Sequence, residues 1–216
     1  WSVVLNDGTT LDADVVILGT GVQPNTEVVA KAVSLEKDGS INADKYLQTS
    51  NQDIFAAGDC VAFPYWYHGK KIKIEHYGEA IQQGQIAAYN MLGKKVEHTQ
   101  VPFFWTRQYT NSLHFVGNAL GYDNVWVDNT STDPKEPKFM AYYAQGDKIL
   151  AVASIGRSPD SMVISEAMQT NSCPPLSDFK SGKVTIADLK KNLAAQKGKS
   201  KCKRADCCKN KKTENK

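Results

Sequence analysis

Short apolar runs separated by turn residues fill the first sixty positions of the chain. Residues 3–5 and 10–11 flank Asn6-Asp7-Gly8, a pattern that predicts a β-hairpin. Residues 13–18 form an apolar run that contains one acid, and Gly19-Thr20-Gly21 closes it. A run of this length closed by glycine predicts a buried strand. The pattern therefore indicates a hairpin that leads into a core strand.

A second apolar run, residues 54–57, ends abruptly at Gly58-Asp59. It also predicts a buried parallel strand, and its small residues would let a ligand or another backbone come close. Asp59 would then lie at the carboxyl end of that strand, where ligands bind in open α/β sheets. An ionised carboxylate only accepts hydrogen bonds, so Asp59 suits the hydroxyl groups of a sugar or a sugar alcohol.

Between these two runs the pattern predicts only short elements. Asn25 or Thr26 can cap a short helix over residues 27–33. Residues 41–43 and 46–48 have the composition of short strands.

Helical spacing begins near Tyr77. Apolar and small side chains recur every three or four positions over residues 77–92, and Gly93 is a typical helix stop. Small side chains on this helix predict close packing on a sheet through Ala80, Gly84 and Ala87. The aromatic stretch before the helix, residues 61–73, has no clear period and predicts an irregular surface loop.

The second half of the chain predicts strands followed by helices. The five predicted strands cover residues 103–109, 112–117, 125–127, 138–145 and 148–155. Gln145-Gly146-Asp147 is a tight turn between the last two. Helices are expected over residues 160–170, capped by Ser158 or Asp160, and over residues 186–193. The chain as a whole therefore predicts a mixed α/β fold.

Composition adds a division between the body of the chain and its end. Hydrophobic residues make up 41% of the chain, enough for a packed core, and no apolar run reaches the roughly 18–20 residues that span a bilayer. Residues 194–216 hold nine Lys and Arg and two acids, which leaves 17 basic and 21 acidic residues elsewhere. We expect this basic tail to be disordered, with contact to nucleic acid, anionic lipid or an acidic partner as the alternative.

The five cysteines exclude two classes of protein. Their odd number, with three in the tail, does not form a disulfide framework, and there is neither a C-x-x-C motif nor an interleaved His for structural zinc. We therefore predict no metal site and a reducing compartment. Cys60 is interpreted as a buried or capping thiol, because no partner lies two to five residues away.

Three candidate sites each have a structural alternative. Asp59 can bind a ligand or cap the following segment. Gly19-Thr20-Gly21 after a strand is a weak dinucleotide signal, because Pro24 replaces the third glycine, and it can equally be a simple turn. Glu75 and His76 precede the helix at 77–92, where a helix start suits anionic or carbonyl ligands, but they can also be a cap and a surface histidine. No catalytic residue follows from these patterns.

Four ordered motifs together resemble the FAD-dependent pyridine nucleotide-disulfide oxidoreductases. They are residues 14–25, residues 49–59, residues 74–77 followed by Ala80 and Gln83-Gly84, and Pro102-Phe103-Phe104-Trp105. Their order and spacing resemble the apoptosis-inducing-factor-like and ferredoxin reductase branch, especially the apoptosis-inducing factor 3 type with an upstream Rieske domain. The resemblance covers residues 1 to about 193.

This resemblance implies FAD and NAD(P)H as cofactors and assigns roles to eight residues. Gly58 and Asp59 would hold the ribityl chain of FAD, and Gly19 and Gly21 would close the NAD(P)H subdomain near the nicotinamide. Next to the isoalloxazine and the nicotinamide would lie Glu75, His76 and Tyr77. Trp105 would pack near the flavin and gate it. The implied reaction is hydride transfer from NAD(P)H to FAD, followed by one-electron transfer to an iron–sulfur acceptor.

The resemblance also implies a division of the chain. Residues 1–22 would end the NAD(P)-binding subdomain, and residues 23–100 would form the carboxy-terminal part of the FAD-binding subdomain. Residues 101–193 would form an α+β carboxy-terminal reductase domain, often the dimer or partner face in relatives. The fold implied is thus the carboxy-terminal part of a two-dinucleotide-domain flavoprotein, with residues 194–216 as a disordered tail.

The sequence departs from the family pattern in one respect. Neither G-x-G-x-x-G motif nor the Cys and His ligands of a Rieske centre occur in these 216 residues, and the chain starts at Trp1 without Met. We therefore expect a carboxy-terminal fragment that alone neither holds FAD tightly nor turns over, with any iron–sulfur cluster in a missing domain or a partner. Two alternatives are an NADH-responsive redox sensor and an apoptosis-related interaction protein. Family analogy favours a mitochondrial or cytoplasmic location.

Overall fold

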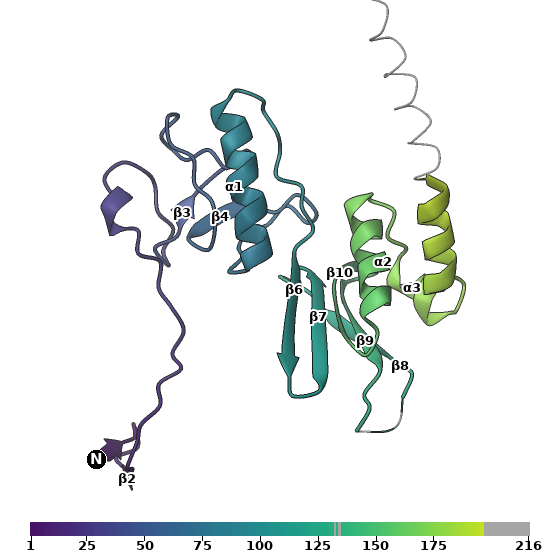
Figure 1. Ribbon diagram of the computed structural model, residues 1–216, viewed down its shortest axis with the longest axis horizontal. Helices are drawn as coiled ribbons and strands as arrows, with labels where there is room; N and C mark the ends of the chain where they lie inside the picture. The colour runs from purple at the N-terminus through teal and green to yellow at the C-terminus, as the bar shows by residue number, and fades with distance from the viewer. Residues whose placement is uncertain (132, 134, 197–216) are drawn as a thin grey trace, which may run out of the picture.

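A computed structural model describes residues 1–131, 133 and 135–196 (Figure 1). The described residues contain a small hairpin, a three-stranded sheet and a five-stranded sheet. The hairpin pairs β1 (Ser2–Val4) with β2 (Thr10–Asp12) in antiparallel register, with Val3 opposite Leu11. Its turn contains Gly8 at a φ of +84°, so the hairpin predicted from Asn6-Asp7-Gly8 is confirmed.

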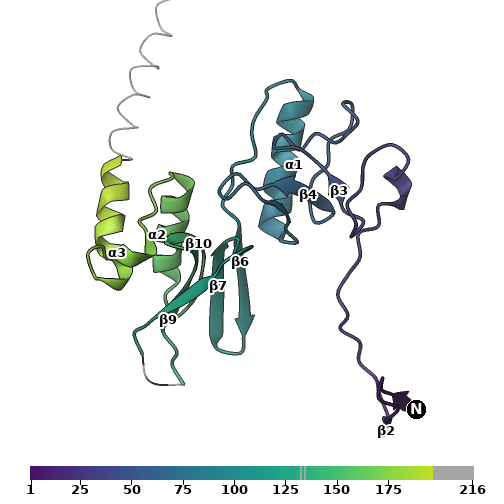
Figure 2. The ribbon, with the colours of Figure 1, turned by 180° about the vertical axis from the view of Figure 1, so that it is seen from behind.

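The strand predicted over residues 13–18 is wrong. These residues form no regular element, and Val15, Ile17 and Leu18 are 74%, 91% and 80% exposed. A strand needs a neighbour to satisfy its backbone groups, and no described strand pairs with this segment. Figures 1 and 2 show it running from the hairpin towards the 3₁₀ helix η1 (Glu27–Val29) apart from both larger sheets.

The helix predicted over residues 27–33 is shorter than expected. Only Glu27–Val29 form a 3₁₀ turn, and turns follow it. The Thr26 hydroxyl does not cap this turn, because it donates a hydrogen bond of 2.6 Å to the carbonyl of Gly39.

The three-stranded sheet corrects the prediction of an irregular surface loop over residues 61–73. It has the order β3 (Ile41–Asn42), β4 (Val61–Pro64) and β5 (Lys71–Lys73), with β3 and β4 parallel and β4 and β5 antiparallel. The stretch 61–73 is therefore a hairpin, and its aromatic residues Phe63 and Tyr65 are core residues rather than loop residues.

The strand predicted over residues 54–57 does not form. Phe55 makes a single bridge to Gln48. The strand predicted over residues 46–48 does not form either, because Tyr46 lies in a turn, Leu47 in a bend, and Gln48 makes only this bridge. Apolar runs of three or four residues predict burial, but a strand also requires a partner segment in register. The Gly58-Asp59 pair thus precedes strand β4 instead of closing a strand.

Helix α1 (Tyr77–Met91) forms where the sequence predicts it, and Gly93 follows at a φ of +73°. The face that it buries differs from the predicted one. The buried side chains are polar except for one, namely Glu79, Gln83, Ala87 and Asn90. Of the predicted stripe of small residues, Ala87 is buried, Ala80 is half-buried and Gly84 is exposed, so the stripe identified the packed face only in part. The reason is that hydrogen bonding compensates the burial of this polar face, as Asn90 shows by bonding to the backbone of Tyr46 and Val96.

The five-stranded sheet confirms all five strands predicted in the second half of the chain. Its antiparallel order is β6 (Phe103–Gln108), β7 (Asn111–Gly117), β10 (Lys148–Ile155), β9 (Phe139–Gln145) and β8 (Asn124–Asn129). β10 lies at the centre, and all its residues from Ile149 to Ser154 are buried. The predicted Gln145-Gly146-Asp147 turn joins β9 to β10.

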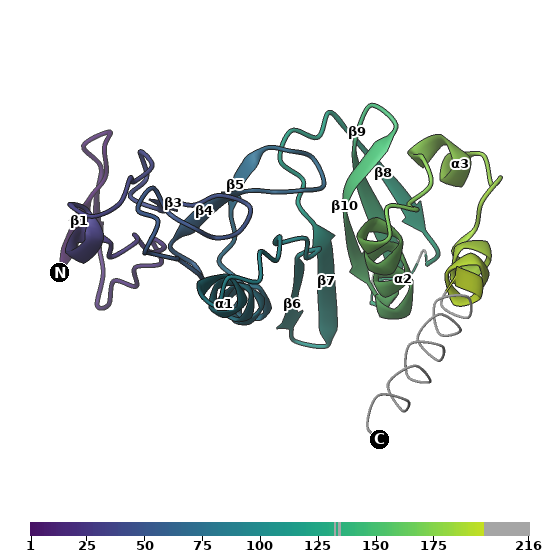
Figure 3. The same ribbon diagram turned by 90° about the horizontal axis from the view of Figure 1, so that it is seen from above.

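Helical segments follow the sheet in the described part of the chain, as Figure 3 shows from above. Helix α2 (Ser158–Gln169) contacts β7 and β10, but its N-cap is Arg157, because Asp160 binds the Arg157 guanidinium at 2.8 Å instead of capping. Helix α3 (Leu176–Lys180) was not predicted, and its Phe179 ring lies 5.4 Å from that of Tyr142.

The last helical segment covers residues 186–196, slightly beyond the predicted range. Thr185 and Asp188 form a reciprocal cap at its start, and Leu189 and Leu193 are buried. Residues 194–196 are therefore helical, contrary to the predicted disorder, while residues 197–216 of the predicted tail lie outside the described residues.

The packing of α2 leads to a stability prediction. Ile164 is fully buried on α2, whereas Met162 on the same helix is 42% exposed. We expect Ile164→Ala to lower the free energy of unfolding by about 2–5 kcal/mol, because it removes buried methyl groups and leaves a cavity. Urea denaturation measures this loss, and Met162→Ala is the control that should change it little. Equal losses in the two variants would contradict the packing described here.

Candidate functional site

The Gly58-Asp59 turn is held on both sides of Gly58. The Val61 N–H donates to the Gly58 carbonyl at 3.1 Å, which closes a turn over Asp59 and Cys60. Gly58 has a φ of +93°, a conformation that favours glycine, and only the Ala80 Cβ, at 3.8 Å, lies near the position of a Cβ on Gly58. Asp59 is exposed and, among the described residues, its carboxylate has no hydrogen bond or ion pair. The turn therefore presents a free acceptor at its tip.

A buried chain of polar groups connects this turn to helix α1. The Gly58 N–H donates to Gln83 Oε1 at 2.8 Å, and Gln83 Nε2 donates to Glu79 Oε1 at 3.2 Å. His98 Nε2 lies 2.5 Å from the same Glu79 oxygen. Sequence reasoning assigned no role to these side chains. The spacing of Glu79 and Gln83, one helical turn apart, is the signal that could have indicated their pairing.

A groove next to the start of α1 contains two of the predicted site residues. It has a volume of about 670 Å³, and Glu75, His76, Phe104 and Phe115 are among the residues that line it. His76 is the N-cap residue of α1, and its ring stacks on Phe104 with 4.7 Å between ring centroids. Its Nδ1 atom is buried and has no hydrogen-bond partner.

The burial of His76 favours its neutral form. Burial lowers the pKa of His76 below its ordinary value, and the charges of Glu79, Asp59 and Glu75 oppose this effect. Asp59 does not line the groove, but this interaction shows that its charge acts on the groove histidine. Glu75 forms an ion pair of 3.0 Å with Lys73 at the edge of the groove.

The remaining predicted site residues lie outside the groove. Tyr77 is 85% exposed, and Trp105 is 62% exposed. Because consecutive strand residues point to opposite faces, Trp105 faces away from the side on which Phe104 contacts His76. Gly19 and Gly21 lie in the segment without regular structure, and no other side chain or backbone atom lies within 4 Å of a Cβ on either residue. The structure therefore brings together only Gly58, Asp59, Glu75 and His76.

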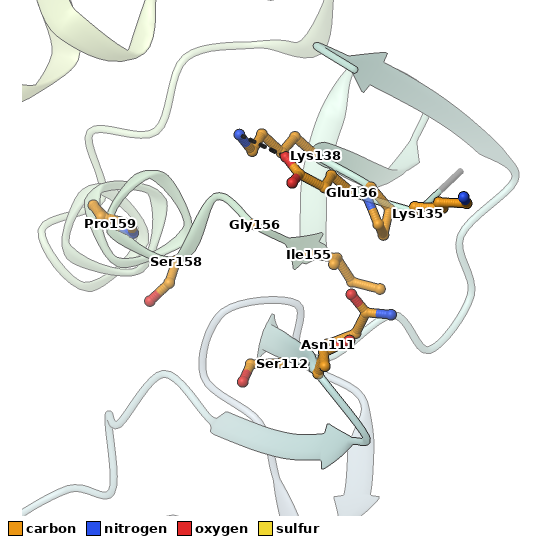
Figure 4. A pocket seen from close by; sticks show the side chains of 11 residues that line it. Asn111, Ser112, Lys135, Glu136, Lys138, Ile155, Gly156, Ser158 and Pro159 are labelled. Carbon is orange, nitrogen blue, oxygen red and sulfur yellow. Dashed lines mark ion pairs between the residues drawn. The ribbon is translucent and has the colours of Figure 1, made fainter. Parts of the chain in front are cut away.

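A second cavity, of about 460 Å³, lies at the opposite end of β7 (Figure 4). It is lined by the β6–β7 turn, by residues 135–138 and by the start of α2, and it includes none of the predicted site residues. Within the described residues, no cluster of three or more His, Cys, Asp or Glu side chains could hold a metal ion. Cys60 and Cys173 are both free thiols.

Comparison with known proteins identifies the family. Residues 1–84 match the model for pyridine nucleotide-disulphide oxidoreductases, and residues 103–190 match the model for the reductase C-terminal domain. The chain belongs to the pyridine nucleotide-disulphide oxidoreductase family. The match to residues 1–84 includes seven of the eight predicted site residues, and Trp105 lies in the second match.

Individual relatives agree with this assignment. The chain is 36% identical to apoptosis-inducing factor 3 of Homo sapiens over 168 residues, which are 77% of this chain and 27% of the relative. It is also 36% identical to putidaredoxin reductase of Pseudomonas putida over 156 residues, 72% of this chain and 36% of the relative. The chain thus spans about a quarter to a third of the lengths of these family members.

Solved structures confirm the fold class of the family. The covalent complex of putidaredoxin reductase with putidaredoxin matches 90% of this chain and 46% of that chain, with a TM-score of 0.75 and 30% identity. A ferredoxin reductase from Rhodopseudomonas palustris matches 89% of this chain and 46% of that chain, with a TM-score of 0.74 and 27% identity. The predicted domain boundaries at residues 22, 100 and 193, and the roles of the eight site residues, stay predictions.

Among the helices in the described range, none combines the length and the hydropathy that a bilayer span requires.

The contact between His76 and Phe104 leads to a pH prediction. We expect Phe104→Ala to raise the pKa of His76 towards its ordinary value of 6.5, because it opens the ring to solvent. An NMR pH titration of the His76 ring measures this, and Tyr109→Ala, at a position that is 97% exposed, is the control. Since the folded state favours neutral His76, its contribution to stability is present above pH 6.5 and is lost as the pH falls. A wild-type His76 that titrates at or above 6.5 would refute this account.

Proposed function

We propose that this chain forms the Asp59 side of an FAD site in an NAD(P)H-dependent reductase that passes electrons to a ferredoxin-type iron–sulfur protein. The observation that carries the proposal is the tethered Gly58-Asp59 turn in a chain of this family. The turn presents a free carboxylate whose charge acts on His76, one of the residues that line the groove. The names of two matched proteins, a putidaredoxin reductase in complex with putidaredoxin and a ferredoxin reductase, support the class of acceptor.

The residues present fit FAD in three respects. Asp59 is an exposed acceptor without a protein partner, which suits a ligand hydroxyl. Gly58 has no side chain that would obstruct a polyhydroxyl chain passing over the turn. The groove offers aromatic surface from Phe104 and Phe115 and the unpartnered Nδ1 of His76, which suit a planar heterocycle with polar edges.

The site residues of the chain have distinct roles in this proposal. When bound, FAD supplies acceptance of a hydride from NAD(P)H and release of the two electrons one at a time to the acceptor. Gly58 and Asp59 bind the ribityl chain and fix its position. His76, held neutral by burial, provides a hydrogen-bonding nitrogen without a competing positive charge, while Phe104 orients its ring. The N-terminus of α1, directly after His76, contributes partial positive charge on the same side.

Exposed apolar surface supports a site that is completed by residues outside these 216. Val15, Ile17 and Leu18 present apolar side chains to solvent, and Tyr77 and Ile81 do so on the outer face of α1. Surfaces of this kind mark contacts with other protein. We propose that segments carrying the G-x-G-x-x-G motifs, which this sequence lacks, cover them.

The role of Asp59 can be tested in the assembled flavoprotein. We expect Asp59→Ala to weaken FAD binding roughly 10- to 150-fold, because it removes a charge-assisted hydrogen bond of about 1.5–3 kcal/mol. Flavin titration with fluorescence detection measures the Kd. Asp53→Ala, an exposed acid in the preceding loop, is the control and should leave the Kd unchanged. An unchanged Kd in Asp59→Ala would eliminate the ribityl assignment.

The reaction itself is tested by steady-state turnover. We expect the assembled flavoprotein to oxidise NADH or NADPH continuously when a ferredoxin-type acceptor is supplied, with the acceptor reduced at two equivalents per nucleotide. Absorbance at 340 nm measures oxidation of the nucleotide, and the visible spectrum of the acceptor measures its reduction. Nucleotide binding without sustained oxidation would instead favour the redox-sensor alternative.

A further inference from the structure

The buried polar face of α1 is unusual for a helix that packs on a small sheet. Gln83 is fully buried, Glu79 is 4% exposed, and His98 is 2% exposed. Side chains of these types are rarely buried unless hydrogen bonds compensate the loss of water. All three belong to the one chain of hydrogen bonds that ends at the Gly58 N–H.

The chemistry of the three groups gives this chain one direction. The Glu79 carboxylate only accepts hydrogen bonds, so it binds the NH₂ group of Gln83 and thereby turns the Gln83 carbonyl oxygen towards Gly58. His98 binds the same carboxylate oxygen through Nε2, and its Nδ1 has no hydrogen-bond partner. The Nε2–H tautomer satisfies this arrangement. Glu79 and His98 therefore set the orientation of the Gln83 amide.

The orientation of Gln83 in turn fixes the turn that carries Asp59. The N–H of Gly58 is bound by Gln83, and its carbonyl accepts from Val61, so the peptide groups on both sides of Gly58 are held. The side chain of Asp59, one residue further on, has no hydrogen bond or ion pair to any described residue. Its direction therefore depends on the backbone of the turn.

We infer that Gln83, oriented by Glu79 and His98, is a positioning residue that holds the Gly58-Asp59 turn in the conformation that binds the polyhydroxyl chain of the flavin. The inference rests on the proposed function for the identity of the ligand. The hydrogen bonds themselves do not depend on it. An apolar residue at position 83 would fill the same space but would leave the Gly58 N–H without a partner.

The first test uses the 216-residue chain without ligand. We expect Gln83→Leu to increase hydrogen exchange of the Gly58 amide roughly 5- to 150-fold, because the buried donor loses its acceptor. Glu79→Gln should increase it less, because Gln83 can then adopt either amide orientation. NMR of the glycine-labelled chain measures the exchange, and a scalar coupling across the hydrogen bond between the Gly58 nitrogen and the Gln83 side-chain carbonyl should be present only in wild type.

Two controls separate positioning from general destabilisation. Gln82→Leu changes an exposed neighbour on the same helix and should leave the Gly58 exchange unchanged. Gly146, in the β9–β10 turn, reports on a distant amide in the same spectrum. An unchanged Gly58 amide in Gln83→Leu would refute the inference. The inference would also be refuted if Gln83→Leu increased hydrogen exchange equally at Gly58 and Gly146 and lowered the stability in urea by a matching amount.

The second test uses a double-mutant cycle in the assembled flavoprotein. We expect Gln83→Leu to weaken FAD binding several-fold in the wild-type background and to have no effect in the Asp59→Ala background, because Gln83 acts through Asp59. Equal effects in both backgrounds would refute this pathway. If Asp59→Ala does not weaken FAD binding, the proposed function fails. If Asp59→Ala weakens binding but Gln83→Leu does not, only the positioning inference fails.

Discussion

The hydrogen bond from the Gly58 N–H to the Gln83 side chain is the interaction on which the candidate site depends. It joins a turn, which has no regular structure of its own, to the buried face of the longest helix in the described chain. Gly58 has a φ of +93°, and glycine adopts positive and negative φ about equally readily, so the hydrogen bonds of the turn select between these conformations. The helix therefore fixes the position of the turn that carries Asp59, and His76 is the N-cap residue of the same helix.

The two halves of the chain differ in how fully they bury their own apolar surface. In the second half, β10 lies between β7 and β9, and α2 contacts the sheet, so apolar strand residues such as Leu150 and Val152 are enclosed. In the first half, residues 13–18 and the outer face of α1 leave apolar side chains in solvent.

Prediction from sequence succeeded where neighbours in the chain are also neighbours in space. The hairpin at β1–β2, the antiparallel strands joined by Gly146, and helix α1 with its stop at Gly93 depend on local turns and local periodicity. Prediction failed for residues 13–18 and 54–57, because an apolar run becomes a strand only when another segment lies beside it. It failed again at the β4–β5 hairpin. The sequence there has no clear period and was predicted to be a surface loop, but the ring of Phe63 is buried.

The sequence by itself determined the family, through four ordered motifs, and with it Asp59 and His76 as candidates. Only the tertiary structure decided that Trp105 points away from the groove, that Phe104 contacts His76, and that α1 buries its polar face. The physical reason is that a motif specifies the residue types at neighbouring positions of the chain. The partners of those side chains, such as His98 for Glu79, come from distant parts of the chain and leave no periodic signal.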